Sequence, residues 1–173
     1  MSPSVSRHGR RLGTLPALEA SRRCGLAARR CRFGLEVVEE VLGVIDPDKV
    51  MVRISPSRDM GGLYDWPDLE DMLDHLIPAF SALGLTMLDI SCARADYYET
   101  SGRIIRMVRP HWQGLMIGGA SLSREQAEQE ISDGLVDMVT WGRHLLANPD
   151  LVSRFRNHTR LEPFDPNMLS SLN

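Results

Sequence analysis

The amino-acid sequence predicts an α/β fold in which about four parallel strands form a sheet covered by helices, and three observations support this prediction. Four short, almost continuously apolar segments begin near residues 50, 86, 114 and 136. Segments with helical periodicity separate them, so strand and helix alternate along the chain. The strand segments are apolar at successive positions, which is typical of parallel sheets buried on both sides. Connections of this length cross over, and we expect the crossovers to be right-handed.

The first helix and strand follow a change in composition at Phe33. Apolar residues at helical spacing predict a helix that ends at Asp46-Pro47-Asp48. The segment "KVMVRISP" then predicts a strand from Val50 to Ile54, which Pro56 terminates. We expect the following segment, "SRDMGGLYDW", to be a glycine-containing loop.

The second helix is predicted to begin at Pro67, because proline suits the first helical turn, and to end at Gly84. Pro78 lies inside this helix and predicts a kink. Apolar residues then predict a second strand from Thr86 to Ser91. A further helix is expected from about Thr100 to Val108.

The last third of the chain contains the two remaining strands, "GLMIGG" and "LVDMVTWG". The helix between them has a capping-box pattern, Ser123 followed by Gln126, and Gly134 suits its carboxyl end. After the fourth strand we expect a short helix from Gly142 to Leu146. Asn148-Pro149 then predicts the start of a last helix, with the asparagine as its N-cap.

Residues 1–29 differ from the rest of the chain. Eight arginines lie within residues 1–32 against one acid, Glu19, and no long apolar period is present. We therefore expect a poorly ordered Arg-rich segment. The same composition resembles a transit peptide, and it is also compatible with a start displaced by truncation or a change of reading frame.

Length and composition restrict the class of protein. A chain of 173 residues has room for one domain with a core, and 43% hydrophobic and 25% charged residues are ordinary globular values. A net charge of −3 gives no reason to expect nucleic acid as a partner. No apolar run reaches the roughly 18 residues of a membrane span, so we expect a cytoplasmic protein with no membrane partner. The three cysteines and five histidines show no metal-binding spacing, and we assign no metal ligand.

Glycines at the ends of the last two strands mark the first candidate site. Gly118 and Gly119 end one strand, and Gly142 follows the other just before Arg143. Glycine lets a backbone approach a ligand closely, amides at a helix start bind anions, and arginine suits phosphate. Barrel enzymes often build a phosphate site at this position. The alternative is that the glycines only form turns and that Arg143 is solvated or ion-paired.

Arg53 is the second candidate, because it lies inside a strand, where an unpaired charge is costly to bury. Near the sheet end it could reach a ligand, or it could form an ion pair with Asp89 on the neighbouring strand. Tyr97 and Tyr98 follow a strand end, but we expect them to serve surface packing. No nucleophile elbow and no nucleotide-binding glycine motif is present, and strand-helix alternation alone does not separate a barrel from an open sheet.

Four segments, in this order and spacing, resemble the Old Yellow Enzyme family of NADH:flavin oxidoreductases and ene-reductases: "RFGLEVVEEV", "VMVRISP", "MIGGAS" and "VTWGRHLLANPDL". The family fold is an FMN-binding (β/α)8 TIM barrel, which uses NADH or NADPH to reduce activated alkenes or quinone-like substrates through the flavin. The resemblance implies a partial barrel, strands five to eight with their covering helices, over residues 30–160. Residues 161–173 would be a carboxyl-terminal tail.

The resemblance also implies roles for the five candidate residues. Arg53 matches an arginine that faces the flavin ring near N1 and O2, where a cation stabilises the negative charge of reduced flavin. Gly118 and Gly119 match the backbone turn at the FMN phosphate. Gly142 and Arg143 match the glycine and arginine at the phosphate and the ring edge.

The resemblance covers only part of the family's barrel, which takes roughly 250 residues when complete. The family's substrate-binding histidine pair and its tyrosine proton donor belong to the first half, so we assign no catalytic residue here. Arg29 also stands where the family has asparagine. We therefore expect an FMN-binding oxidoreductase half that needs a complementing amino-terminal half or self-association, because a half barrel exposes strand edges. The alternatives are a non-catalytic remnant or regulatory paralogue with a phosphate or FMN half-site, and an unrelated phosphosugar-binding half barrel.

Overall fold

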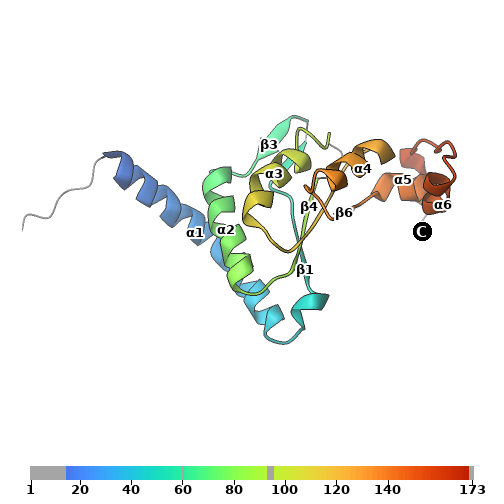
Figure 1. The fold of residues 1–173 in the computed structure, drawn as a ribbon. Coiled ribbons are helices and arrows are strands. Elements are labelled where there is room, and N and C mark those ends of the chain that lie inside the picture. The colour runs from blue at the N-terminus through green and yellow to red at the C-terminus, as the bar shows by residue number, and fades with distance from the viewer. Residues whose placement is uncertain (1–14, 60, 93–95, 172–173) are drawn as a thin grey trace, which may run out of the picture.

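The computed structural model describes residues 15–59, 61–92 and 96–171, and it confirms the α/β fold. Four strands form one sheet in the order β1-β4-β5-β6, and every neighbouring pair is parallel. The strands are β1 (Met51–Ile54), β4 (Met87–Ser91), β5 (Leu115–Gly119) and β6 (Met138–Val139). Figure 1 shows the sheet with α2, α3 and α4 packed along it and the last two helices at one end.

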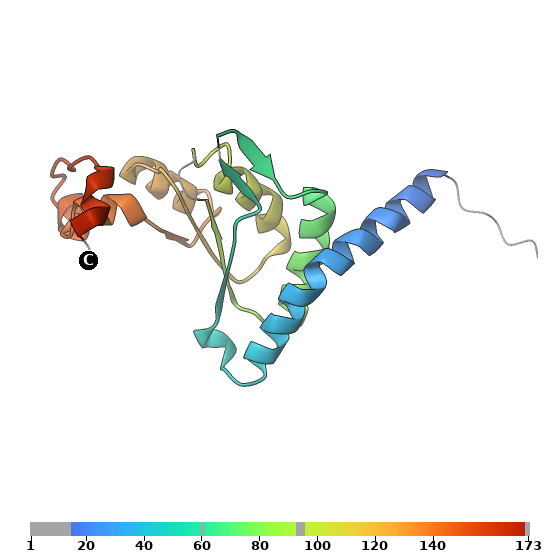
Figure 2. The same ribbon diagram turned by 180° about the vertical axis from the view of Figure 1, so that it is seen from behind.

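The first helix is longer than the sequence led us to expect. α1 (Leu15–Leu42) begins eighteen residues before Phe33 and projects away from the body of the molecule (Figures 1 and 2). Residues 15–29 thus belong to a helix, while residues 1–14 lie outside the described residues. The cause is propensity, because alanine, leucine and arginine dominate this stretch and are strong helix formers.

Five further helices were predicted, and four of them are present with small shifts of their ends. They are α2 (Leu69–Ala82), α3 (Ser101–Val108), α4 (Arg124–Ser132) and α5 (Gly142–Ala147). Ser123 and Gln126 form the expected capping box at the start of α4. Short 3-10 helices lie at Pro47–Lys49, Arg109–His111 and Pro166–Ser171.

The last helix, α6 (Leu151–Arg156), corrects one prediction. Its N-cap is Asp150, and Asn148 is instead the residue that ends α5. The Asn148 side chain is buried, donates to the carbonyls of His144 and Glu162 at 3.0 and 3.1 Å, and accepts from the Glu162 amide at 2.8 Å. It therefore fastens the carboxyl-terminal segment to α5 instead of capping a helix.

The predicted loop after β1 contains a β-hairpin that the sequence analysis missed. Strands β2 (Ser57–Asp59) and β3 (Leu63–Asp65) pair antiparallel across the turn. Gly61 and Gly62 have φ values of 89° and 154°, and both amides donate to Asp59 Oδ1. Two short segments around a Gly-Gly pair are a recognised hairpin signal, which could have predicted this element.

The fourth strand is shorter than predicted, since only Met138 and Val139 pair with β5 instead of most of residues 135–142. The reason lies at its start, where the amides of Leu135 and Val136 donate to the Glu130 carbonyl at the end of α4. These two residues therefore continue the helix end and are not available to the sheet.

Helices cover one face of the sheet, and the other face is open within the described ranges. Leu88, Ile90 and Met116 point into the core, where they join buried side chains of α2 and α3. Alternate strand residues point the opposite way. That open face carries exposed apolar residues, including Met51 at 46%, Leu115 at 45% and Met138 at 54% exposure.

A buried polar network holds α3 and α4 together. Tyr97, which we expected at the surface, is 1% exposed and donates its hydroxyl to Glu130 Oε2 at 2.8 Å. Arg106 donates to Glu130 Oε1 at 2.6 Å and to the Gly102 carbonyl at 2.9 Å. Burial and the Glu130 carboxylate raise the pKa of Tyr97 well above its ordinary value, so its hydroxyl stays a donor.

Replacing Arg106 should destabilise the fold more than replacing Tyr97, because Glu130 is buried and Arg106 is its charged partner. We expect Arg106→Met to lower the free energy of unfolding by about 3 kcal/mol. Tyr97→Phe removes one hydrogen bond and should cost about 1 kcal/mol. Urea unfolding followed by circular dichroism measures both, with Arg156→Met as the control for an exposed arginine. Equal losses in the three variants would contradict this assignment.

Candidate functional site

The structure brings the ends of β5 and β6 together. Gly118 is the register partner of Val139, and the Thr140 amide donates to the Gly118 carbonyl at 2.8 Å. The loops beyond these strands are also joined, because Trp141 Nε1 donates to the Leu122 carbonyl at 3.0 Å. All four candidate residues from this region therefore lie at the carboxyl end of the same two strands.

Gly118 and Gly119 are required by packing. A Cβ on Gly118 would lie 2.5 Å from Ile105 Cδ1 and 3.0 Å from Val136 Cγ1, both in the core. A Cβ on Gly119 would lie 2.4 Å from the Thr140 carbonyl oxygen. These contacts alone explain why glycine occupies both positions. Both glycines lie in strand β5 and not in a turn, which was the alternative that the sequence left open.

Packing does not account for Gly142 and Arg143, in contrast to Gly118 and Gly119. A Cβ on Gly142 would meet no atom within 4 Å, so packing does not explain this glycine. Arg143 is exposed, and its guanidinium has no hydrogen-bond or ion-pair partner among the described residues. A free guanidinium beside an open glycine is the arrangement expected where a backbone approaches an anionic ligand.

Arg53 lies on the open face of the sheet and is held by Asp89. Its Nε donates to Asp89 Oδ2 at 2.7 Å, and its terminal nitrogen lies 2.6 Å from the same oxygen. Asp89 is fully buried, whereas the Arg53 side chain is 56% exposed. The ion pair considered from the sequence is therefore present. A guanidinium has five N–H donors, so this pair leaves donors free for a ligand.

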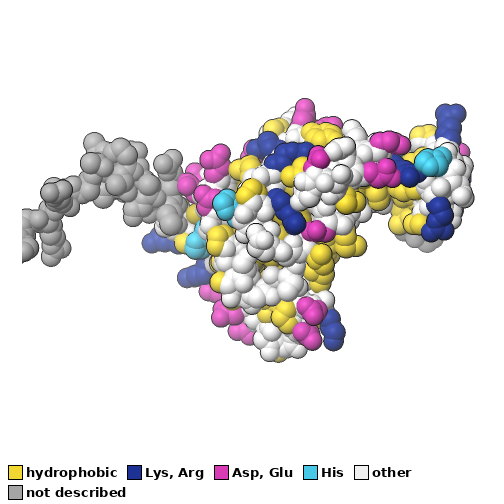
Figure 3. Space-filling model, viewed as in Figure 1, with side chains coloured by type: hydrophobic (Ala, Val, Ile, Leu, Met, Phe, Trp, Pro, Cys, Tyr) yellow, Lys and Arg dark blue, Asp and Glu magenta, His cyan; other side chains and the backbone are white. Residues whose placement is uncertain are grey.

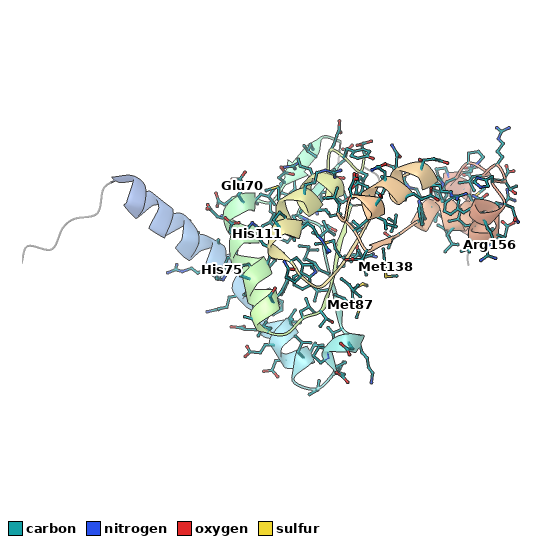
Figure 4. The ribbon with its side chains drawn as sticks, in the orientation of Figure 1. Glu70, His75, Met87, His111, Met138 and Arg156 are labelled. Atoms are coloured by element: carbon teal, nitrogen blue, oxygen red, sulfur yellow. The ribbon has the colours of Figure 1, made fainter. Side chains whose placement is uncertain are left out.

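The strand register determines which residues lie side by side across the open face. Arg53 pairs with Asp89, Asp89 with Ile117, and Ile117 with Met138. Met87 and Met138, labelled in Figure 4, belong to this face. Arg53 is thus three strand spacings from β6, roughly 14 Å at about 4.8 Å per spacing. A ligand that contacts both Arg53 and Arg143 must be elongated.

Within the described ranges, no cluster of three or more His, Cys, Asp or Glu side chains is placed to bind a metal. Among these residues, no helix combines the length and hydrophobicity that crossing a bilayer requires.

Comparison with known proteins gives a consistent result. The model of the NADH:flavin oxidoreductase / NADH oxidase family matches residues 21–162. The 12-oxophytodienoate reductase 7 of Oryza sativa subsp. japonica is 31% identical over 155 residues, which cover 81% of this chain and 39% of the relative. A probable flavin mononucleotide-dependent alkene reductase of Leishmania infantum is 29% identical over 142 residues, covering 82% and 38% respectively.

Two solved structures share the fold. The old yellow enzyme from Trypanosoma cruzi aligns with a TM-score of 0.68 at 27% identity, over 82% of this chain and 37% of that chain. Morphinone reductase in complex with tetrahydroNAD aligns with a TM-score of 0.66 at 28% identity, over 82% and 38%. The chain thus spans about two fifths of the length of the proteins it matches. A partial TIM barrel, as the sequence predicted, agrees with this coverage.

Removing Arg53 should destabilise the protein because it leaves the buried Asp89 carboxylate without its cation. We expect Arg53→Met to lower the free energy of unfolding by about 3 kcal/mol. The double variant Arg53→Met/Asp89→Leu removes both charges and should regain most of that loss. Arg143→Met, which breaks no contact with a described residue, should change stability by less than about 0.5 kcal/mol. Urea unfolding measures all three, and a double variant no better than Arg53→Met would refute the pairing.

Proposed function

Because the chain belongs to the NADH:flavin oxidoreductase / NADH oxidase family, we propose that it binds FMN at the carboxyl ends of its parallel strands. Combined with the rest of an eight-stranded barrel, it forms an oxidoreductase that uses NADH or NADPH to reduce an activated alkene or a quinone-like substrate. Bound FMN supplies the hydride-transfer chemistry. The family match excludes an unrelated phosphosugar-binding half barrel.

The residues present fit the FMN phosphate at one end of the site. Gly142 leaves open space at the backbone, and Arg143 offers a guanidinium that no described residue uses. This pair is the observation that carries the proposal, because packing does not account for it. Gly118 and Gly119 contribute by allowing β5 and β6 to approach closely, so that both loops could contact one phosphate.

Arg53 fits the other end of an elongated cofactor. Its guanidinium is oriented by Asp89 and remains more than half exposed on the open face. A fixed cation at this position would stabilise negative charge on a reduced flavin ring without moving. Asp89 orients the Arg53 guanidinium through its Oδ2 oxygen, which makes it a positioning residue.

No described residue is assigned to substrate activation or proton donation. We propose that these steps use residues from the rest of the barrel, so that activity requires that part as well. A non-catalytic or regulatory paralogue that keeps only the FMN half-site is the alternative. The two differ in one observable, which is NADH oxidation after the barrel is completed.

We expect the purified chain to retain FMN on a sizing column, and Arg143→Ala to raise the FMN dissociation constant at least tenfold. The loss reflects one charge-assisted phosphate contact, about 1.5–3 kcal/mol. Gly142→Ala should also weaken binding, since its methyl group would stand between backbone and phosphate while the fold stays intact. Fluorescence titration with FMN measures both effects.

Arg156→Ala is the matched control, because Arg156 is an exposed arginine on α6 whose side chain points away from the body in Figure 4. It should bind FMN as the unmodified chain does. Equal weakening in Arg143→Ala and Arg156→Ala would indicate only general electrostatic attraction. Colourless fractions at saturating FMN, with or without the rest of the barrel, would overturn the proposal.

A further inference from the structure

We propose that the hollow between α4 and α6 binds a small zwitterion with an apolar body, of the class of an α-amino acid with an aromatic or aliphatic side chain. None of the residues proposed for FMN lines this hollow. The inference goes beyond the proposed function, and it depends neither on the cofactor nor on further strands.

The hollow has a volume of about 470 Å³, which lies within the roughly 300–1,000 Å³ of small-molecule sites. Its walls come from the loop after β5 with the first turn of α4, from His144 on α5, and from α6 with the residues that follow it. In Figure 3, acidic, basic and histidine side chains lie close together where α4 faces the last two helices. Because this chain supplies the walls on both sides, the hollow exists without the rest of a barrel.

Two guanidinium groups line the hollow and are held in place by bonds to other residues. Arg124 donates from Nε to Glu128 at 2.6 Å and from Nη1 to a backbone carbonyl of α6. Arg154 donates from Nε to Asp150 at 2.7 Å and from Nη1 to the Arg160 carbonyl at 2.8 Å. Neither Nη2 group has a hydrogen-bond partner among the described residues. Two oriented guanidinium groups with unused donors suit a carboxylate.

Glu125 brings the opposite charge to the lining of the hollow. A hydrogen bond from its own backbone amide, and another from the Ser123 hydroxyl at 3.0 Å, lower the pKa of its carboxyl group. The carboxylate therefore stays ionised at neutral pH and accepts hydrogen bonds from a cation such as an ammonium group. Because the lining carries charges of both signs, it suits a zwitterion better than a simple anion.

Apolar side chains also line the hollow, namely Leu122, Phe155 and Leu161. The Phe155 ring is held by Trp141 in a T-shaped contact with a centroid distance of 5.0 Å. Trp141 in turn donates from Nε1 to the Leu122 carbonyl at 3.0 Å. A wall that is already fixed lowers the entropy cost of binding an apolar group. An α-amino acid with an aromatic or aliphatic side chain combines this apolar group with both charges.

Two histidines in the lining offer further hydrogen-bonding groups. His158 Nδ1 lies 3.1 Å from Arg124 Nη1 and accepts from it, so the neutral ring carries its proton on Nε2. His144 Nδ1 is buried and has no hydrogen-bond partner among the described residues. An unpaired buried nitrogen is costly. A charged group of the ligand would supply the missing partner once the His144 ring turns toward the hollow.

The test measures the binding of L-phenylalanine to the purified chain by isothermal titration calorimetry. Hydrocinnamate lacks the ammonium group of this ligand, and phenethylamine lacks its carboxylate. We expect phenylalanine to bind about tenfold more tightly than either, because each of them loses one charge-assisted contact. Saturation with FMN should leave the phenylalanine affinity unchanged, since no residue proposed for FMN lines the hollow.

Two variants separate the two charges of the ligand. Glu125→Gln removes the negative charge and keeps an acceptor for Ser123, so it should weaken phenylalanine binding about tenfold and leave hydrocinnamate binding unchanged. Arg154→Met removes a guanidinium and should weaken the binding of both ligands. Arg156→Met is the matched control, because Arg156 is an exposed arginine on the same helix that does not line the hollow.

Circular dichroism must show that each variant keeps the fold, and the comparison of the three ligands on the unmodified chain needs no variant. Absence of saturable phenylalanine binding would overturn the proposal. Equal affinities for the three ligands, or unchanged phenylalanine binding in Glu125→Gln, would also overturn it, since the charges would then not recognise a zwitterion. A chain that binds phenylalanine but never retains FMN would leave this site intact and refute the proposed cofactor, so the two failures are distinguishable.

Discussion

A parallel sheet of four strands with helices on one side cannot bury both of its faces, and most properties of this protein follow from that constraint. The buried face has a dense core of aliphatic residues from β4, β5 and the helices α2 and α3. The opposite face keeps its apolar residues in contact with solvent, at a cost of about 25 cal/mol per Å² of exposed apolar surface relative to burial. The outer edge of β1 also has no strand beside it within the described ranges.

The glycines at the site are of two kinds, which differ in whether a side chain would fit at the position. Gly118 and Gly119 let the core and β6 approach β5, and a side chain at either position would collide with core or backbone atoms. Gly142 lies past the strand end in open space. In the sequence, glycine follows a predicted strand in both places. Among these three glycines, Gly142 is the one that no packing contact explains. The proposed anion site therefore depends on Gly142 and Arg143, while Gly118 and Gly119 set how closely β5 and β6 approach.

Much of this arrangement could be predicted from local sequence. Apolar runs located four strands, and the capping box at Ser123 located α4, because both signals depend on neighbouring residues alone. The missed hairpin and the early start of α1 depend on local sequence, whereas other errors arose where contacts outside the local pattern decide. Asn148 has the sequence context of an N-cap, but the backbone of Glu162 uses its side chain. Leu135 and Val136 look like strand residues, but the end of α4 takes their amides. The role of Gly118 depended on Ile105, which no local pattern reveals.

The pair of Arg53 and Asp89 shows how the exposed face and the chemistry are connected. A fully buried carboxylate requires a cation, and the strand register supplies one directly across from it. The other oxygen of Asp89, Oδ1, is buried and has no hydrogen-bond partner among the described residues. Such an oxygen is costly in a finished interior. We therefore expect a ligand or a covering segment to donate a hydrogen bond to Asp89 Oδ1 on this face. One explanation then covers both the buried carboxylate that orients Arg53 and the apolar residues around it. In a partial TIM barrel, this face of the sheet is the inner wall.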